Sequence, residues 1–134
     1  MEHKKTYISK QYSIDDVEYI IEGPVSKAQL DLMSFDQGLT AFRYSDEQFE
    51  AIKEISTLDE GRIFILKQQS HIIGYVTFHY PDPLERWSTG ELEYLIELGA
   101  IEISLPYRKL HLGKELIQTS LASDEIEDYI ILTT

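Results

Sequence analysis

The feature that most constrains the fold is an alternating pattern over residues 95–105 that changes phase once. Apolar residues occupy even positions as far as Leu98 and odd positions from Ile101 onward. Alternation with a period of two is typical of a β-strand with one buried face, and one extra residue restores a common face after such a slip. Glycine tolerates the backbone of an inserted residue, so the sequence predicts a β-bulge at Gly99-Ala100.

The residues after this strand predict a βαβ unit. Pro106-Tyr107 ends the strand, and apolar residues then recur at helical spacing from Leu112 to Leu121. Residues 129–132 form a short, fully apolar run, which is the pattern of a strand covered on both faces. A strand, a tight loop, a helix and a strand in this order predict two parallel strands with a right-handed crossover.

Three further strands are expected upstream. Apolar residues alternate within residues 16–22, and the pattern stops at Gly23-Pro24. Residues 62–67 and 72–80 are rich in β-branched and aromatic side chains. The polar residues 68–71 between them predict a hairpin loop, so these two strands pair with each other.

Two helices are expected between the first strand and the hairpin. Ser26 and Ser45 are each followed three residues later by Gln, the capping-box pattern that marks a helix N-terminus. The second helix is the clearer, because Phe49, Ile52 and Ile55 lie along one of its faces.

Length and composition exclude several classes of protein. The 134 residues predict one domain spanning residues 1–134. The net charge of −12 argues against nucleic acid and anionic membranes as partners, because both require clustered Lys and Arg. The chain has no cysteine, which excludes disulfides and thiolate zinc sites and fits a reducing cytoplasm. We expect neither a secretory signal nor a membrane-spanning helix, since the apolar runs are too short.

A small basic segment interrupts the acidic sequence where the expected strand leads into the helix. Residues 108–114 hold three of the twelve strong bases and a histidine, whereas residues 87–107 contain four Glu and no Lys or Arg. The N-terminus of a helix favours an anion, so a phosphate-bearing ligand fits this place. The alternative is that these bases only solvate a surface loop. His71 and His79 have no metal-ligand spacing, and we expect no metal site.

The basic segment resembles the signature of the GNAT superfamily of N-acetyltransferases. That signature, Gln/Arg-x-x-Gly-x-Gly/Ala, follows a bulged strand and opens a helix, and it matches Arg108-Lys109-Leu110-His111-Leu112-Gly113 with His111 in place of the first glycine. This departure suggests a changed backbone path or crowding near the pyrophosphate. The order of the expected elements also resembles the first five strands of the family.

A narrower resemblance is to the acetoin-utilisation acetyltransferases, the AcuA family. Several unusual strings carry it, and they occur in the same order along the chain: residues 21–24, 60–63, 74–78, 80–88, 95–102 and 129–134. The string Tyr80-Pro81-Asp82-Pro83-Leu84-Glu85-Arg86-Trp87-Ser88 is the most specific of them.

The resemblance implies an α/β fold: a GNAT-like mixed central sheet with a bulged fourth strand, helices on both faces, and the family's C-terminal strands missing. It implies a protein lysine N-acetyltransferase that uses acetyl-CoA and inactivates AMP-forming acetyl-CoA synthetase. A GNAT acting on a small amine and a non-catalytic acyl-CoA-binding domain are the alternatives. Since the family continues beyond a strand like residues 129–132, we expect an open sheet edge that another copy of the chain could complete.

The resemblance also assigns the expected cosubstrate site. Main-chain groups of Ile101, Glu102 and Ile103 would meet the pantetheine arm in the gap that the bulge opens. The pyrophosphate would lie against the remaining predicted residues: Arg108, Lys109, Leu110, His111, Leu112, Gly113 and Lys114.

Acetyl transfer to an amine also requires a proton acceptor. A lysine amine must be neutral to attack a thioester, so a carboxylate or a water chain must take its proton. Glu97 and Glu102 are the candidates, since the bulge makes the two face the same way. Glu97 is preferred, because it lies eleven residues before Arg108, where several related enzymes carry their glutamate base. The alternative is that either glutamate faces solvent or pairs with a base.

Overall fold

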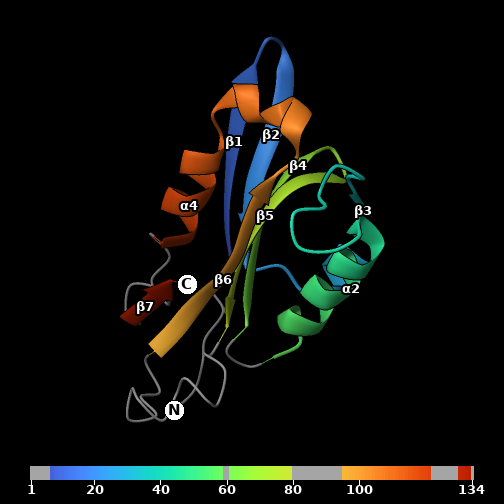
Figure 1. Ribbon diagram of the computed structural model, residues 1–134. Helices are drawn as coiled ribbons and strands as arrows, with labels where there is room; N and C mark the ends of the chain where they lie inside the picture. The colour runs from blue at the N-terminus through green and yellow to red at the C-terminus, as the bar shows by residue number, and fades with distance from the viewer. Residues whose placement is uncertain (1–6, 59–60, 80–94, 122–129, 134) are drawn as a thin grey trace.

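The protein is built on one mixed β-sheet, seen in a computed structural model that describes residues 7–58, 61–79, 95–121 and 130–133. Six strands follow one path in the order β1-β2-β4-β5-β6-β7, and the short strand β3 pairs with β5. Figure 1 shows helix α2 on one side of this sheet and helix α4 on the other. The expected mixed sheet with helices on both faces is confirmed.

The elements have the following bounds. The strands are β1 (Ile8–Ile14), β2 (Val17–Gly23), β3 (Ser34–Phe35), β4 (Arg62–Gln68), β5 (His71–His79), β6 (Leu95–Ile103) and β7 (Ile130–Thr133). The helices are α1 (Lys27–Leu30), α2 (Ser45–Ser56) and α4 (Gly113–Leu121), and a 3₁₀ helix, η2 (Leu105–Leu110), precedes α4.

The predicted bulge lies in β6. Phe78 pairs with Leu98 and Thr77 with Ala100, so Gly99 is the extra residue of the antiparallel β5–β6 ladder. Beyond the bulge Ile101 packs against the core on the α4 side of the sheet. The parity slip in the sequence therefore has the physical cause that was predicted for it.

The βαβ unit is also confirmed. Strand β6 leads through η2 and α4 into β7, which pairs parallel to β6 from Leu95 opposite Ile130 to Leu98 opposite Thr133. Figure 1 shows β7 beside only the part of β6 farthest from the η2 end. Among the described residues, the β6–β7 pairing thus reaches Leu98, directly before the bulged Gly99.

Two strands were not predicted, and they change the numbering of the bulged strand. β1 pairs with β2 through a two-residue turn at Asp15 and Asp16, both of which have positive φ. β3 is only two residues long and pairs parallel to the start of β5. The bulged strand is therefore the sixth in chain order rather than the fourth.

The hairpin is tighter than predicted. Its turn comprises only Gln69 and Ser70, and Gln69 has a positive φ of 55°. His71 begins β5 and is not a loop residue.

The two predicted helix starts have different outcomes. Ser26 forms the predicted capping box with Gln29, although α1 is only one turn long. The capping box at Ser45 is wrong, because Tyr44 is the N-cap of α2 and makes no side-chain cap bond. The predicted apolar face of α2 is confirmed, since Ile52 is buried and Phe49 and Ile55 pack beside it.

The core lies in two layers, one on each face of the sheet. Leu116 of α4 and Leu112, which directly precedes this helix, pack with Phe64 and Val76 on one face. On the other face, the core residues are Val25, Leu30, Leu39, Ile52, Ile63, Ile65, Ile72 and Tyr75. Among the residues that the structure describes, no helix is long and apolar enough to cross a membrane.

Candidate cosubstrate and acceptor site

The basic segment forms a tight turn between β6 and α4. The 3₁₀ helix ends at His111, which adopts the left-handed conformation with φ 57° and ψ 31°. Glycine reaches this conformation freely, and His is among the residues that tolerate it best. His111 therefore has backbone angles that suit the glycine of the signature, which answers the expectation of a changed backbone path.

Five of the predicted cosubstrate residues line one pocket of about 350 Å³: Ile103, Arg108, His111, Gly113 and Lys114. The Arg108 Nε donates a hydrogen bond to the main-chain oxygen of Ile103 at 2.8 Å, which holds the guanidinium against the end of β6. The pocket brings together two fixed cations, one imidazole and the N-terminus of α4, whose first-turn N–H groups and dipole favour an anion.

The other predicted residues of the segment do not line this pocket. The Leu112 side chain is buried in the core, and Leu110 packs against the same cluster. Lys109 is exposed and is not among the residues that line the pocket. The alternation of pocket and core residues through the turn is what a 3₁₀ helix followed by an α-helix produces.

Gly113 leaves space that the fold itself does not need. A Cβ added there would meet Ile103 Cγ1 at 3.6 Å, which is ordinary van der Waals contact. Neither packing nor a positive φ requires glycine here. Because Gly113 has no side chain, the main chain at the helix N-terminus stays accessible from the pocket. That is the condition for close approach of a ligand to the main chain.

On the side of β6 that faces β7, part of the main chain has no strand partner among the described residues. The Ser104 N–H donates to the Ile73 oxygen of β5 at 2.8 Å, so by alternation the main-chain groups of Ile101 and Ile103 point away from β5. They point to the side on which β7 has paired only as far as Leu98. In the described part of the chain, residues 99–103 thus have a strand neighbour on one side only.

Glu102 is held in a buried hydrogen-bond network. One carboxylate oxygen accepts the Tyr75 hydroxyl proton at 2.9 Å, and the other accepts the Ala41 N–H at 2.8 Å. The Gln48 amide donates to the same Tyr75 oxygen at 3.0 Å. Burial, followed by the hydrogen bond to Glu102, raises the pKa of Tyr75. Both oxygens of Glu102 thus accept hydrogen bonds, one from the segment that precedes α2 and one from Tyr75 of β5.

Glu97 lies in β6, two residues before the bulged Gly99. Its position pairs with His79 of β5, whereas Glu102 pairs with Tyr75, and these partners are an even number of residues apart. The register therefore puts positions 97 and 102 on the same side of the sheet, as expected. The Glu97 side chain lies outside the described parts, as do residues 80–94.

The sequence reasoning did not predict a polar cluster at the end of β6. Asp36 accepts hydrogen bonds from the Ser104 hydroxyl at 2.5 Å and the Gly38 N–H at 3.0 Å. Its other oxygen contacts His71 Nε2 at 2.8 Å, and His71 Nδ1 lies 2.7 Å from the Ser34 hydroxyl. Because Ser104 directly precedes η2, this cluster anchors the start of the basic turn.

Asp36 gives a pH-dependent prediction. Burial raises its pKa, but the hydrogen bonds from Ser104, His71 and Gly38 outweigh burial and hold the pKa below its ordinary value. A lowered folded-state pKa contributes stability that is present above the ordinary Asp pKa of about 3.9 and is lost as the pH falls through the folded value. We expect Asp36→Asn to lower the free energy of unfolding by about 1–3 kcal/mol at neutral pH.

Urea unfolding at pH 7 and at about pH 3 measures this effect. The difference between wild type and Asp36→Asn should shrink at the lower pH, because the wild-type carboxyl group then begins to protonate. Glu18→Gln, at an exposed carboxylate of β2, is the control and should change stability by less than about 0.5 kcal/mol. A pH-independent loss at Asp36 would contradict the electrostatic explanation.

No metal site is seen in this part of the protein. Within the described ranges, no three His, Asp or Glu side chains are grouped so that they could hold a metal ion.

Comparison with known proteins agrees with this geometry. The sequence pattern of the acetyltransferase (GNAT) family matches residues 29–129. The chain is 49% identical over 134 residues to the acetoin utilization proteins AcuA of Bacillus licheniformis and Bacillus subtilis. The alignment covers 100% of this chain and 64% of each relative's length.

A solved structure shows the same fold. The crystal structure of the acetoin utilization protein from Exiguobacterium sibiricum superposes with a TM-score of 0.90 at 45% identity, over 97% of this chain and 62% of that one. The bulged strand, the basic turn and the family match agree over most of the chain. This chain belongs to the acetyltransferase (GNAT) family.

Proposed function

We propose that the protein binds acetyl-CoA and transfers its acetyl group to a lysine of a protein, acting in the cytoplasm in acetoin and acetate metabolism. The observation that carries this proposal is the pocket of Ile103, Arg108, His111, Gly113 and Lys114 at the N-terminus of α4. The chain spans 64% of the length of the AcuA relatives, and the metabolic context is supported by their being acetoin utilization proteins.

The pocket suits a pyrophosphate in charge and in shape. Arg108 and Lys114 supply positive charge, and His111 supplies a ring nitrogen that can donate a hydrogen bond. The lack of a side chain at Gly113 lets phosphate oxygens approach the first N–H groups of the helix. An anion with several oxygens can bind to all of these groups at once. A loop that carried one exposed lysine would not offer such a set of groups.

The side of β6 that faces β7 suits the pantetheine arm. This arm carries amide groups, and the main-chain groups of Ile101 and Ile103 that point away from β5 are complementary to them. An arm lying there would act as a substitute strand between β6 and β7. The thioester at its end would then lie near the bulge, next to the last described pair of β6 and β7, Leu98 and Thr133.

For the acceptor we propose a lysine of AMP-forming acetyl-CoA synthetase. The neutral amine attacks the thioester carbonyl to form the amide C–N bond, and the C–S bond breaks. The amine loses a proton to a base, and CoA leaves as a thiolate that takes up a proton. Glu97 is the proposed proton acceptor, because its position lies next to the bulge. Glu102 is the less suitable candidate, since both of its oxygens already accept hydrogen bonds.

The test combines binding and transfer. Isothermal titration should show one acetyl-CoA site, and incubation with acetyl-CoA and the synthetase should give acetyl-lysine detectable by mass spectrometry. Acetylation of polyamines or amino sugars with the synthetase left unmodified would instead favour a small-amine enzyme. Binding without any transfer would favour an acyl-CoA-binding domain, and absence of binding would refute the proposal.

Gly113→Ala should separate stability from binding. The added Cβ makes only ordinary contact with Ile103, and alanine stabilises a helix over glycine by about 0.5–1 kcal/mol, so the free energy of unfolding should not fall. The same methyl group faces the pocket that Gly113 lines, so acetyl-CoA affinity should fall about tenfold.

Urea unfolding and titration of the same preparation measure the two effects. Ser120→Ala at a buried position of α4 serves as a control that leaves the pocket intact. If Gly113→Ala binds acetyl-CoA as well as wild type, the phosphates do not lie against this turn of the helix.

A further inference from the structure

Two adjoining hollows lie on the surface formed by residues 40–44 and helix α2. One has a volume of about 580 Å³ and the other about 600 Å³, and both are lined by Arg43 and Glu47. We call this surface the α2 groove, and its lining residues are Thr40, Ala41, Phe42, Arg43, Tyr44, Asp46, Glu47, Phe49, Glu50, Ala51 and Glu54.

The groove combines exposed aromatic rings with an excess of negative charge. Phe42 is 54% exposed and Tyr44 is 77% exposed, although neither is needed to complete a core layer. The larger hollow is lined by four carboxylates and one guanidinium, from Asp46, Glu47, Glu50, Glu54 and Arg43. Such a surface is complementary to a segment that carries positive charge on long aliphatic stems.

Helix stability accounts for only part of this charge. Asp46 and Glu47 lie in the first turn of α2, where the helix dipole favours acids. Glu54 lies in the last turn, where the dipole disfavours acids. Glu50 lies 3.7 Å from Lys53 in an i,i+3 ion pair, and its side chain is 70% exposed. The acidic character thus continues along the helix beyond the turn in which it stabilises the fold.

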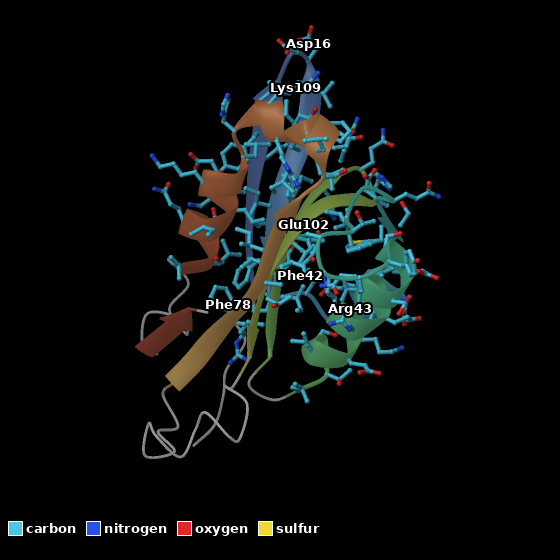
Figure 2. All side chains as sticks on the ribbon, viewed as in Figure 1. Asp16, Phe42, Arg43, Phe78, Glu102 and Lys109 are labelled. Atoms are coloured by element: carbon cyan, nitrogen blue, oxygen red, sulfur yellow. The ribbon has the colours of Figure 1, made fainter. Side chains whose placement is uncertain are left out.

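The groove is tied directly to the bulged strand. The Ala41 N–H donates to Glu102 of β6, so the segment that lines the groove is fixed against the strand beside the proposed thioester site. Figure 2 shows Glu102, Phe42 and Arg43 following one another from β6 toward α2. A chain lying along the groove would therefore pass close to the bulge.

We propose that the α2 groove docks a basic segment of the acceptor protein, in which Lys or Arg residues flank the lysine to be acetylated. The flanking cations pair with Glu50 and Glu54, and their aliphatic stems lie on Phe42 and Tyr44. The role of the segment as an acceptor rests on the proposed function, whereas the docking itself needs no acetyl-CoA.

The first experiment measures peptide binding without acetyl-CoA. Two labelled short peptides, each with one central lysine, carry either arginines or glutamates on both sides and are titrated by fluorescence anisotropy. We expect the arginine peptide to bind at least about tenfold more tightly and to weaken as salt rises, since exposed charges are screened. Equal binding of the two peptides, or no binding of either, would overturn the proposal.

The second experiment compares charge reversals of equal size. Glu54→Lys should weaken binding of the arginine peptide by about five- to tenfold, a typical effect of reversing one docking charge. It removes an acid from the last turn of α2 and so favours the helix, which means that lost binding cannot come from unfolding. Glu18→Lys makes the same change of net charge on β2 and should leave binding near the wild-type value. If Glu18→Lys weakens binding as much as Glu54→Lys, only net charge is sensed and the groove is refuted.

The aromatic contribution and a competing occupant need their own readouts. Phe42→Ala should weaken peptide binding several-fold while leaving acetyl-CoA affinity unchanged. Should the groove instead hold a second copy of this chain, sedimentation would show a dimer that Glu54→Lys dissociates, and the arginine peptide would not bind, which would overturn the proposal. A protein that binds acetyl-CoA but neither peptide refutes the docking alone, and one that binds the arginine peptide but not acetyl-CoA refutes the proposed function alone.

Discussion

Arg108→Glu is expected to weaken acetyl-CoA binding by about a hundredfold or more. The Arg108 side chain lines the pocket at the N-terminus of α4, where its Nε is held by the main-chain oxygen of Ile103. Replacement removes a charge-assisted donor and puts a carboxylate where phosphate oxygens are proposed to lie. A hundredfold change corresponds to about 2.7 kcal/mol, which matches the loss of one such bond together with new repulsion. Isothermal titration measures the change.

Lys109→Glu is the matched comparison for this prediction. It makes the same change of net charge one residue away, but Lys109 is exposed and does not line the pocket. Only long-range electrostatics remain, so its effect should stay within about threefold at physiological salt. Circular dichroism establishes that both variants are folded. Equal effects of the two variants would mean that the basic segment acts as a diffuse charge and not as a built site.

The sequence predicts the bulged strand well because the cause is local. A one-residue insertion reverses the parity of every later side chain, so the slip between Leu98 and Ile101 is visible without any structure. The β4–β5 ladder has a second irregularity, which the sequence pattern does not reveal. Leu66 pairs with Gly74 and Lys67 with Ile72, so Ile73 is the extra residue in β5. Ile72 is buried on one face and Ile73 on the other, and two adjacent isoleucines look the same with or without a bulge.

The missed strand β1 shows where turn chemistry carries information. Its hairpin with β2 turns at Asp15 and Asp16, which both adopt positive φ. Two-residue hairpin turns favour Asn, Asp and Gly for this reason, so the Asp-Asp pair was an available signal. Most of the polar residues of β1 are exposed, and the strand therefore lacks the regular apolar alternation that predicts a strand.

The candidate site was predictable only in part. The basic segment could be identified because its positive charge contrasts with the acidic sequence around it. His111, which replaces the glycine of the signature, adopts the left-handed conformation at the end of η2. The contact of Ala41 with Glu102 joins residues 61 positions apart and depends on how the segment before α2 folds back on β6. No spacing in the sequence encodes such a contact, so Glu102 could be named as a candidate base but its hydrogen-bond partners could not.

Removing the Glu102 network is expected to produce the largest loss of stability among the polar substitutions considered. Glu102 is 6% exposed, and it accepts hydrogen bonds from the Tyr75 hydroxyl and the Ala41 N–H. In Glu102→Gln one of these donors faces an amide NH₂ group instead of an acceptor, so we expect a loss of about 2–4 kcal/mol in the free energy of unfolding. Tyr75→Phe leaves the Gln48 amide and one Glu102 oxygen without this partner and should cost about 1–3 kcal/mol.

A double-mutant cycle between these two positions tests the network directly. Because each single variant breaks the same hydrogen bond, the double variant should be less destabilised than the sum of the two, with a coupling of about 1 kcal/mol or more. Tyr12→Phe is the matched control, since its hydroxyl lies 3.3 Å from Glu115 at a partly buried site and its loss should cost less than about 0.5 kcal/mol. If Glu102→Gln instead abolishes acetyl transfer with no loss of stability, Glu102 acts in proton transfer, and the role in positioning residues 40–44 is wrong.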